Sequence, residues 1–141
     1  MHACTIIARN YLAHARVLAS SYLDHHPEGT FSVIVLDLDD TVDRESEPFE
    51  MIDPEQVIDP GEFGTMSLIY SVMELATAVK PKLLDYLMAR EGGPVLYLDP
   101  DIEVFGSLAP VYEQAAEHGI VLTPHTLDPV PRDGRNPSET F

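Results

Sequence analysis

Two aspartates, Asp99 and Asp101, have the residue type and the spacing that most directly predict chemistry in this chain. They follow residues 94–98, an apolar run with the character of a buried strand. Side chains two positions apart on an extended segment point the same way, so both carboxylates are expected to face one point in space. Two such carboxylates repel each other unless a cation separates them, and hard oxygen ligands suit magnesium, manganese or calcium. The alternative for these residues is a solvated Asp-Pro-Asp turn.

The overall charge restricts the classes of ligand. The 141 residues carry a net charge of -16, which argues against nucleic acid and against an anionic membrane surface as partners. An acidic protein can still bind an anionic ligand when a metal ion mediates the contact. The single cysteine, Cys4, cannot form an internal disulfide, and the sequence has neither a signal peptide nor a long apolar run. We therefore expect a soluble, cytoplasmic protein with one domain, residues 1–141.

The elements that must position the aspartates alternate between strands and helices. Short apolar runs predict strands at 3–8, 31–38, 94–98 and 119–123. Helical periodicity predicts helices at 11–25, 65–79, 82–91 and 108–118. Pro81 is expected to stop one helix or start the next, and Gly92 and Gly93 are expected to end it. The order predicts an α/β fold with a mostly parallel sheet and flanking helices.

Residues 37–62 differ in composition from the rest of the chain. They are rich in Asp and Glu, and Arg44 is their one basic residue. Scattered apolar residues allow one short strand at about 49–52. This acidic excursion is expected to lie on the surface, outside the core, with its charge solvated.

Several polar segments follow the predicted strands directly. In parallel sheets, ligands bind beyond the carboxyl ends of the strands. Residues 8–11, Asp37 and the pair Asp99 and Asp101 all follow strand ends. We therefore expect them to share one crevice.

One acidic motif has a competing interpretation. Residues 37–41, Asp-Leu-Asp-Asp-Thr, resemble the DxDxT signature of haloacid-dehalogenase-type phosphatases. That resemblance implies a nucleophile at Asp37, an acid/base at Asp39 and magnesium between them. Three features disfavour it: a βα unit precedes the motif, the span to Lys80 lacks the expected strand ending in Ser or Thr, and the residues after Thr41 are charged.

The ordered set of segments 6–11 (IIARNY), 15–21 (ARVLASS), 74–81 (ELATAVKP) and 95–101 (VLYLDPD) resembles GT-A-fold glycosyltransferases. The resemblance is closest to the glycogenin and bacterial lipopolysaccharide galactosyltransferase group and extends over nearly all of the chain. It implies a Rossmann-like nucleotide-diphospho-sugar transferase fold. The implied activity is transfer of a sugar from a nucleotide-diphosphate sugar, most simply a UDP-sugar, to an acceptor that the sequence does not identify.

The same resemblance implies roles for individual residues. Asp99 and Asp101 would bind Mn²⁺ or Mg²⁺, which bridges the donor phosphates. Lys80 would lie near the donor phosphate, although a solvated lysine is an equal alternative. Asp37 would contact the base or ribose, with capping of a turn as its alternative. The nucleotide pocket would be formed by Ala8, Arg9, Asn10 and Tyr11, with Tyr11 near the base.

Members of this group are usually longer than this chain. The chain is therefore expected to be the nucleotide-binding part of a transferase, incomplete at its C-terminus, with acceptor contacts and a further metal ligand beyond Phe141. Apolar faces left without cover predict self-association. A third interpretation is a non-catalytic nucleotide-sugar-binding remnant.

Overall fold

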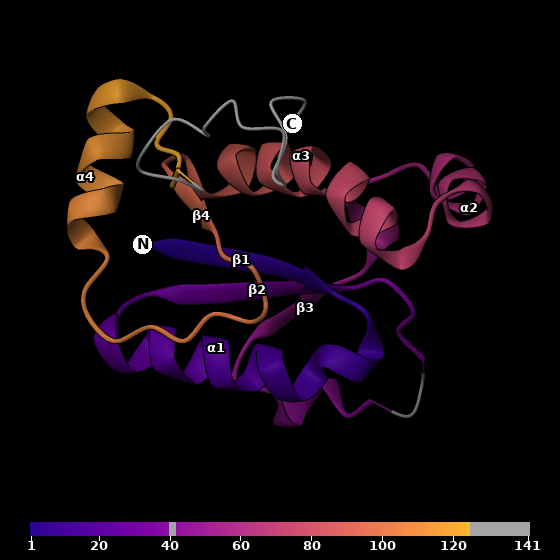
Figure 1. Cartoon of the computed structure of the whole chain (residues 1–141), viewed down its shortest axis with the longest axis horizontal. Helices are drawn as coiled ribbons and strands as arrows, with labels where there is room; N and C mark the ends of the chain where they lie inside the picture. Colours follow the sequence, from indigo (N-terminus) through magenta and orange to yellow (C-terminus); the bar gives the residue numbers. More distant parts are fainter. Residues whose placement is uncertain (40–41, 125–141) are drawn as a thin grey trace, which may run out of the picture.

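The computed structural model describes residues 1–39 and 42–124 and shows a four-stranded sheet between helices (Figure 1). The strands are β1 (His2–Ile7), β2 (Thr30–Val35), β3 (Glu50–Ile52) and β4 (Val95–Tyr97). Their order in the sheet is β3-β2-β1-β4, and every neighbouring pair is parallel. The predicted α/β class and the parallel sheet are thus confirmed.

Alternation along β1 divides the core into two layers. Ala3 and Ile7 pack on the face covered by α1 (Leu12–His25), whereas Cys4 and Ile6 pack on the opposite face. That opposite face is covered by α3 (Val72–Glu91), which buries an apolar stripe of Leu75, Val79, Leu83 and Leu87. Figure 1 shows the sheet between these two helices. A strand buried on both faces is expected to be largely apolar, as β1 and β2 are in the sequence.

The remaining helices are shorter and lie at the periphery. They are α2 (Pro60–Ile69), α4 (Ala109–His118) and the 3₁₀ turns η1 (Arg9–Tyr11), η2 (Arg44–Ser46) and η3 (Pro54–Gln56). Helix α2 projects away from the sheet (Figure 1) and fully buries none of its residues, although Phe63 and Met66 are half-buried against the core on the α3 side. The predicted helices at 11–25 and 108–118 match α1 and α4.

The predicted boundaries near the middle of the chain are wrong. Helix α2 ends at Ile69, where a helix over 65–79 was expected, and α3 then continues through Pro81. A capping box between Ser71 and Glu74 starts α3, because each side chain binds a backbone N–H of the other residue. Pro81 removes one hydrogen bond from the helix, but burial of the surrounding apolar stripe keeps the helix continuous. Gly92, with φ 69°, ends α3 as predicted.

Two further expectations need correction. Residues 119–123 form no strand, and Ile120 and Leu122 are largely exposed, because this segment does not pair with the short edge strand β4. The acidic excursion does not lie wholly outside the core. Its short strand is present as β3 and pairs with β2, and its apolar residues Phe49, Ile52 and Ile58 are buried.

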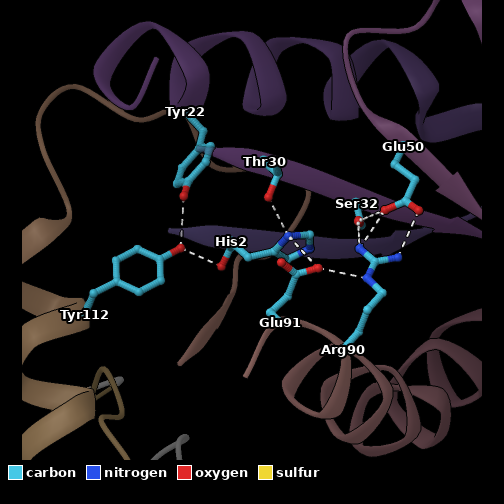
Figure 2. A network of polar contacts seen from close by, with 8 residues as sticks. All are labelled: His2, Tyr22, Thr30, Ser32, Glu50, Arg90, Glu91 and Tyr112. Carbon is cyan, nitrogen blue, oxygen red and sulfur yellow. Dashed lines mark hydrogen bonds and ion pairs between the residues drawn. The ribbon is translucent and has the colours of Figure 1, made fainter. Parts of the chain in front are cut away.

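A polar network connects residues at the amino ends of the strands, which we call the amino edge of the sheet (Figure 2). The Arg90 guanidinium at the end of α3 donates to both carboxylate oxygens of Glu50, over 2.9 and 2.8 Å, and to Glu91 over 2.8 Å. Ser32 on β2 also donates to Glu50, over 2.6 Å. These contacts tie the end of α3 to β2 and β3.

Candidate functional site

The strand order places a topological switch point between β1 and β4. The chain passes from β1 to β2 and β3 on one side of the sheet and returns to add β4 on the other. Crevices at such reversals, beyond the carboxyl ends of the strands, are the usual ligand sites of open α/β sheets. The two strands pair only over His2–Cys4 of β1, and the last bond is from the Leu98 amide to the Cys4 carbonyl, 3.0 Å. Beyond it, the carboxyl half of β1 pairs with β2 alone.

Arg9 connects the ends of the first two strands. Its backbone N–H donates to Oδ1 of Asp37 over 2.6 Å, and its guanidinium binds the Asp39 carboxylate. Asp37 therefore caps the turn after β1, which was the alternative role considered for it. The same contacts bind the first two aspartates of the phosphatase-like motif to Arg9, and Asp40 and Thr41 of that motif lie outside the described residues.

The turn after β1 presents an aromatic side chain. The Tyr11 amide donates to the Ala8 carbonyl over 2.9 Å, which closes η1 and directs the chain into α1. Tyr11 is 41% exposed, and its ring lies 4.8 Å from the His14 ring, centroid to centroid. Asn10 is exposed beside it. A partly exposed aromatic face of this kind is a platform on which a nucleobase can stack.

Lys80 and Asp99 meet across the switch point from different elements. The Lys80 ammonium, on α3, lies 3.6 Å from Oδ1 of Asp99, the second residue after β4. The same ammonium lies 3.9 Å from the centre of the Tyr97 ring. Burial, together with the nearby Asp99 carboxylate, raises the pKa of Tyr97 to about 12, so the phenol stays neutral beneath the lysine.

The backbone around the aspartate pair differs from the expected extended form. The Ile102 amide donates to the Asp99 carbonyl over 3.2 Å, so residues 99–102 form a turn. The alternation argument for convergent side chains does not apply to a turn. Asp99 instead contacts Lys80, while Asp101 lines a hollow of about 290 Å³ with Ala13 and His14 of α1.

The donor set at this turn suits a hard divalent ion only in part. Among residues 1–39 and 42–124, no three His, Cys, Asp or Glu side chains gather as a metal cluster. Asp99 and Asp101 supply two carboxylates on one turn. Magnesium commonly binds through one or two carboxylates and completes its shell with water and phosphate oxygens. The two carboxylates therefore match this requirement in type and number, with the remaining ligands left to water and to a bound diphosphate.

The segment that carries Asp101 is fixed against α1. We call residues 98–108 the return segment, because they run from β4 back along the α1 side of the sheet (Figure 1). The Val104 amide donates to the Ser21 hydroxyl over 3.0 Å, and the Leu108 amide donates to Nε2 of His26 over 2.9 Å. Ser21 on α1 and His26, which caps this helix, thus hold the return segment in place beyond the turn.

Sequence reasoning did not single out Tyr97 or His14. Tyr97 lies two residues before Asp99, and His14 lies three residues after Tyr11. Three-residue spacing on a helix places side chains on one face, which was the available signal for His14. The contact of Tyr97 with Lys80 joins residues far apart in the sequence, so only the sheet topology reveals it.

Comparisons with known proteins give one solved structure and no sequence family. No family model and no curated protein matches this chain. A crystal structure of the galactosyltransferase LgtC in complex with donor and acceptor sugar analogues is similar, with 22% identity and a TM-score of 0.45. The match covers 79% of this chain and 41% of that one, so the chain spans less than half of that protein. No helix in the described part of the chain is long and apolar enough to cross a membrane.

Proposed function

We propose that this chain is the nucleotide-sugar-binding part of a metal-dependent glycosyltransferase. The observation that carries the proposal is the switch point: the turn after β1 and the aspartate turn after β4 flank the reversal in strand order. An aromatic platform, a lysine and two carboxylates lie on the segments that follow these strands and on the helix beside them. These are the groups that a base and a diphosphate require.

The proposed division of roles follows the chemistry of each group. Tyr11 stacks on the base, and Asn10 offers an exposed amide for the base or ribose. Asp99 and Asp101 hold Mn²⁺ or Mg²⁺, which when bound neutralises charge on the departing nucleoside diphosphate. Lys80 adds a positive charge near the phosphates. The donor is most simply a UDP-sugar, and the acceptor is not specified by the residues described here.

Manganese binding is the first test of this proposal. Electron paramagnetic resonance of free Mn²⁺, titrated into the purified chain, measures the affinity directly. We expect binding by the native chain and loss of binding in both Asp99→Asn and Asp101→Asn. Asp85→Asn, an exposed aspartate on α3, is the matched control and should bind as the native chain does. Unchanged affinity in both turn variants would overturn the metal site.

Nucleotide binding and turnover form the second test. Calorimetry should show that UDP binds more tightly with Mn²⁺ than without it, and that Tyr11→Ala weakens UDP binding through loss of stacking. An assay for release of UDP from UDP-sugars then separates an enzyme from a binding remnant. Binding without turnover would favour the remnant, whereas absence of UDP binding at millimolar concentrations would contradict both.

A further inference from the structure

Lys80 already provides Asp99 with a cation. The ammonium lies 3.6 Å from Oδ1, and the lysine is held from below by the Tyr97 ring at 3.9 Å. A lysine over an aromatic face is stabilised by the ring quadrupole as well as by its carboxylate. The two contacts come from residues two positions apart, Tyr97 at the end of β4 and Asp99 in the turn after it, so the ammonium contacts both the ring and the carboxylate.

A divalent ion at Asp99 would need the same oxygen. The lysine charge repels any metal ion that approaches the carboxylate, and the ammonium occupies one side of it. The Asp99 side chain is 63% exposed, so this repulsion is moderated by water and depends on salt.

From this arrangement, and resting on the metal site of the proposed function, we propose that Lys80 is an internal competitor of the divalent ion. In the metal-free chain its ammonium neutralises Asp99, and a metal ion displaces it. The displaced ammonium is then free to pair with the phosphates of the donor. Metal binding and diphosphate binding are thereby coupled through one lysine that exchanges a carboxylate for a phosphate.

The competition predicts opposite effects of a single substitution. Lys80→Met keeps most of the aliphatic stem and removes the charge, so Mn²⁺ alone should bind about threefold to tenfold more tightly. UDP in the presence of saturating Mn²⁺ should bind more weakly, because the phosphate loses its lysine. Added potassium chloride should reduce the gain in metal affinity.

Lys82→Met is the matched control. Lys82 is on the same helix and pairs with Glu62 at 3.3 Å, so its removal changes the net charge equally without freeing Asp99. We expect less than a twofold change in Mn²⁺ affinity. An equal gain in both lysine variants would assign the effect to net charge and overturn the competition.

Proton and carbon resonances of the Lys80 εCH₂ group report the displacement itself. Because the ammonium lies over the Tyr97 ring, these protons should be shifted upfield by the ring current, and Tyr97→Leu should remove that shift. Diamagnetic Mg²⁺ should move them toward ordinary lysine values. If the native chain binds metal through Asp99 and the Lys80 signals do not move, the competition fails while the proposed function stands. If Lys80→Met also binds no metal, the metal site fails and the competition fails with it.

Discussion

Nε2 of His26 accepts the backbone N–H of Leu108 over 2.9 Å, and Nδ1 of the same ring lies 3.0 Å from the Tyr22 carbonyl. Because Nε2 accepts, the imidazole is neutral with its hydrogen on Nδ1, which donates to Tyr22. The ring is buried and stacks on Tyr22 with centroids 4.5 Å apart. One side chain therefore closes α1 and anchors the return segment.

Substitution of His26 should destabilise the protein and release that segment. His26→Ala leaves the Leu108 amide without its acceptor and removes a stacked ring, and we expect a loss of roughly 2 kcal/mol or more in the free energy of unfolding. Urea denaturation measures it. The exposed neighbour His25 offers the control, since His25→Ala should change stability by no more than about 0.5 kcal/mol. Equal effects of the two substitutions would show that the contact with Leu108 contributes little.

The ion pair at the amino edge predicts a pH dependence. Hydrogen bonds from Arg90 lower the pKa of Glu50 below its ordinary value of 4.5. A carboxylate whose pKa is lowered on folding contributes stability above its unfolded pKa, and this contribution is lost as the pH falls through the folded value. The difference in stability between the native chain and Glu50→Gln should therefore be present at pH 7 and shrink below about pH 4.5.

The expected size of this effect is modest. The Glu50 side chain is 50% exposed, so solvent screening keeps the contribution below about 1 kcal/mol. Urea titrations of both proteins at several pH values between 3 and 7 provide the measurement. Glu28→Gln, at an exposed site between α1 and β2, is the control. A stability difference for Glu50→Gln that grows toward acid would have the wrong sign for this assignment.

Two buried tyrosines should be energetically coupled. The Tyr112 hydroxyl donates to the His2 carbonyl over 2.6 Å and lies 3.0 Å from the Tyr22 hydroxyl. Figure 2 shows both contacts as dashed lines. A double-mutant cycle with Tyr22→Phe and Tyr112→Phe should give a coupling of about 1 kcal/mol, because each single change leaves the other hydroxyl short of a partner. If urea denaturation shows that the two substitutions change the free energy of unfolding additively, the contact between the hydroxyls contributes no measurable stability.

Exposed apolar side chains near the α2–α3 junction predict association in solution. Leu68 is 90% exposed and Met73 is 81% exposed. Sedimentation velocity should detect species larger than a monomer, and the double variant Leu68→Ser with Met73→Ser should shift the distribution toward monomer without loss of stability. The control is Leu83→Ala, which creates a cavity in the buried stripe and should cost about 2–5 kcal/mol. A native chain that remains monomeric at all concentrations contradicts the prediction.

The sheet was predictable because its signal is local and repeated. Apolar runs at β1, β2 and β4 mark strands, and the βαβ order fixes their parallel direction. The continuous α3 was not predictable, because Pro81 is a strong local stop signal that the buried stripe overrides only in the folded chain. The segment 119–123 is apolar enough for a strand, but pairing decides strands, and pairing is a tertiary property.

The sequence predicted which residues follow the strand ends. It did not predict how their side chains are arranged. Placing Arg9, Asp37 and Asp99 at one edge requires only the strand order. The hydrogen bond from Ile102 to Asp99 converts an expected extended segment into a turn, and the contact of Lys80 with Tyr97 depends on how α3 lies across the sheet. Neither follows from spacing in the sequence. The metal ion and the role of each residue toward a nucleotide sugar stay predictions.

Helix α3 is one continuous helix that connects the carboxyl ends of the strands with their amino ends. Lys80 faces the switch point and Arg90 holds the opposite edge, about 15 Å apart along the helix axis. Pro81 has no N–H, so the Thr77 carbonyl receives no bond from it, and we expect the helix to bend most easily next to Lys80. If Lys80 shifts, we therefore expect α3 to bend near Pro81 while Arg90 stays paired with Glu50. In amide hydrogen exchange, ligand-dependent changes should concentrate around residues 77–84 and fade toward the anchored end.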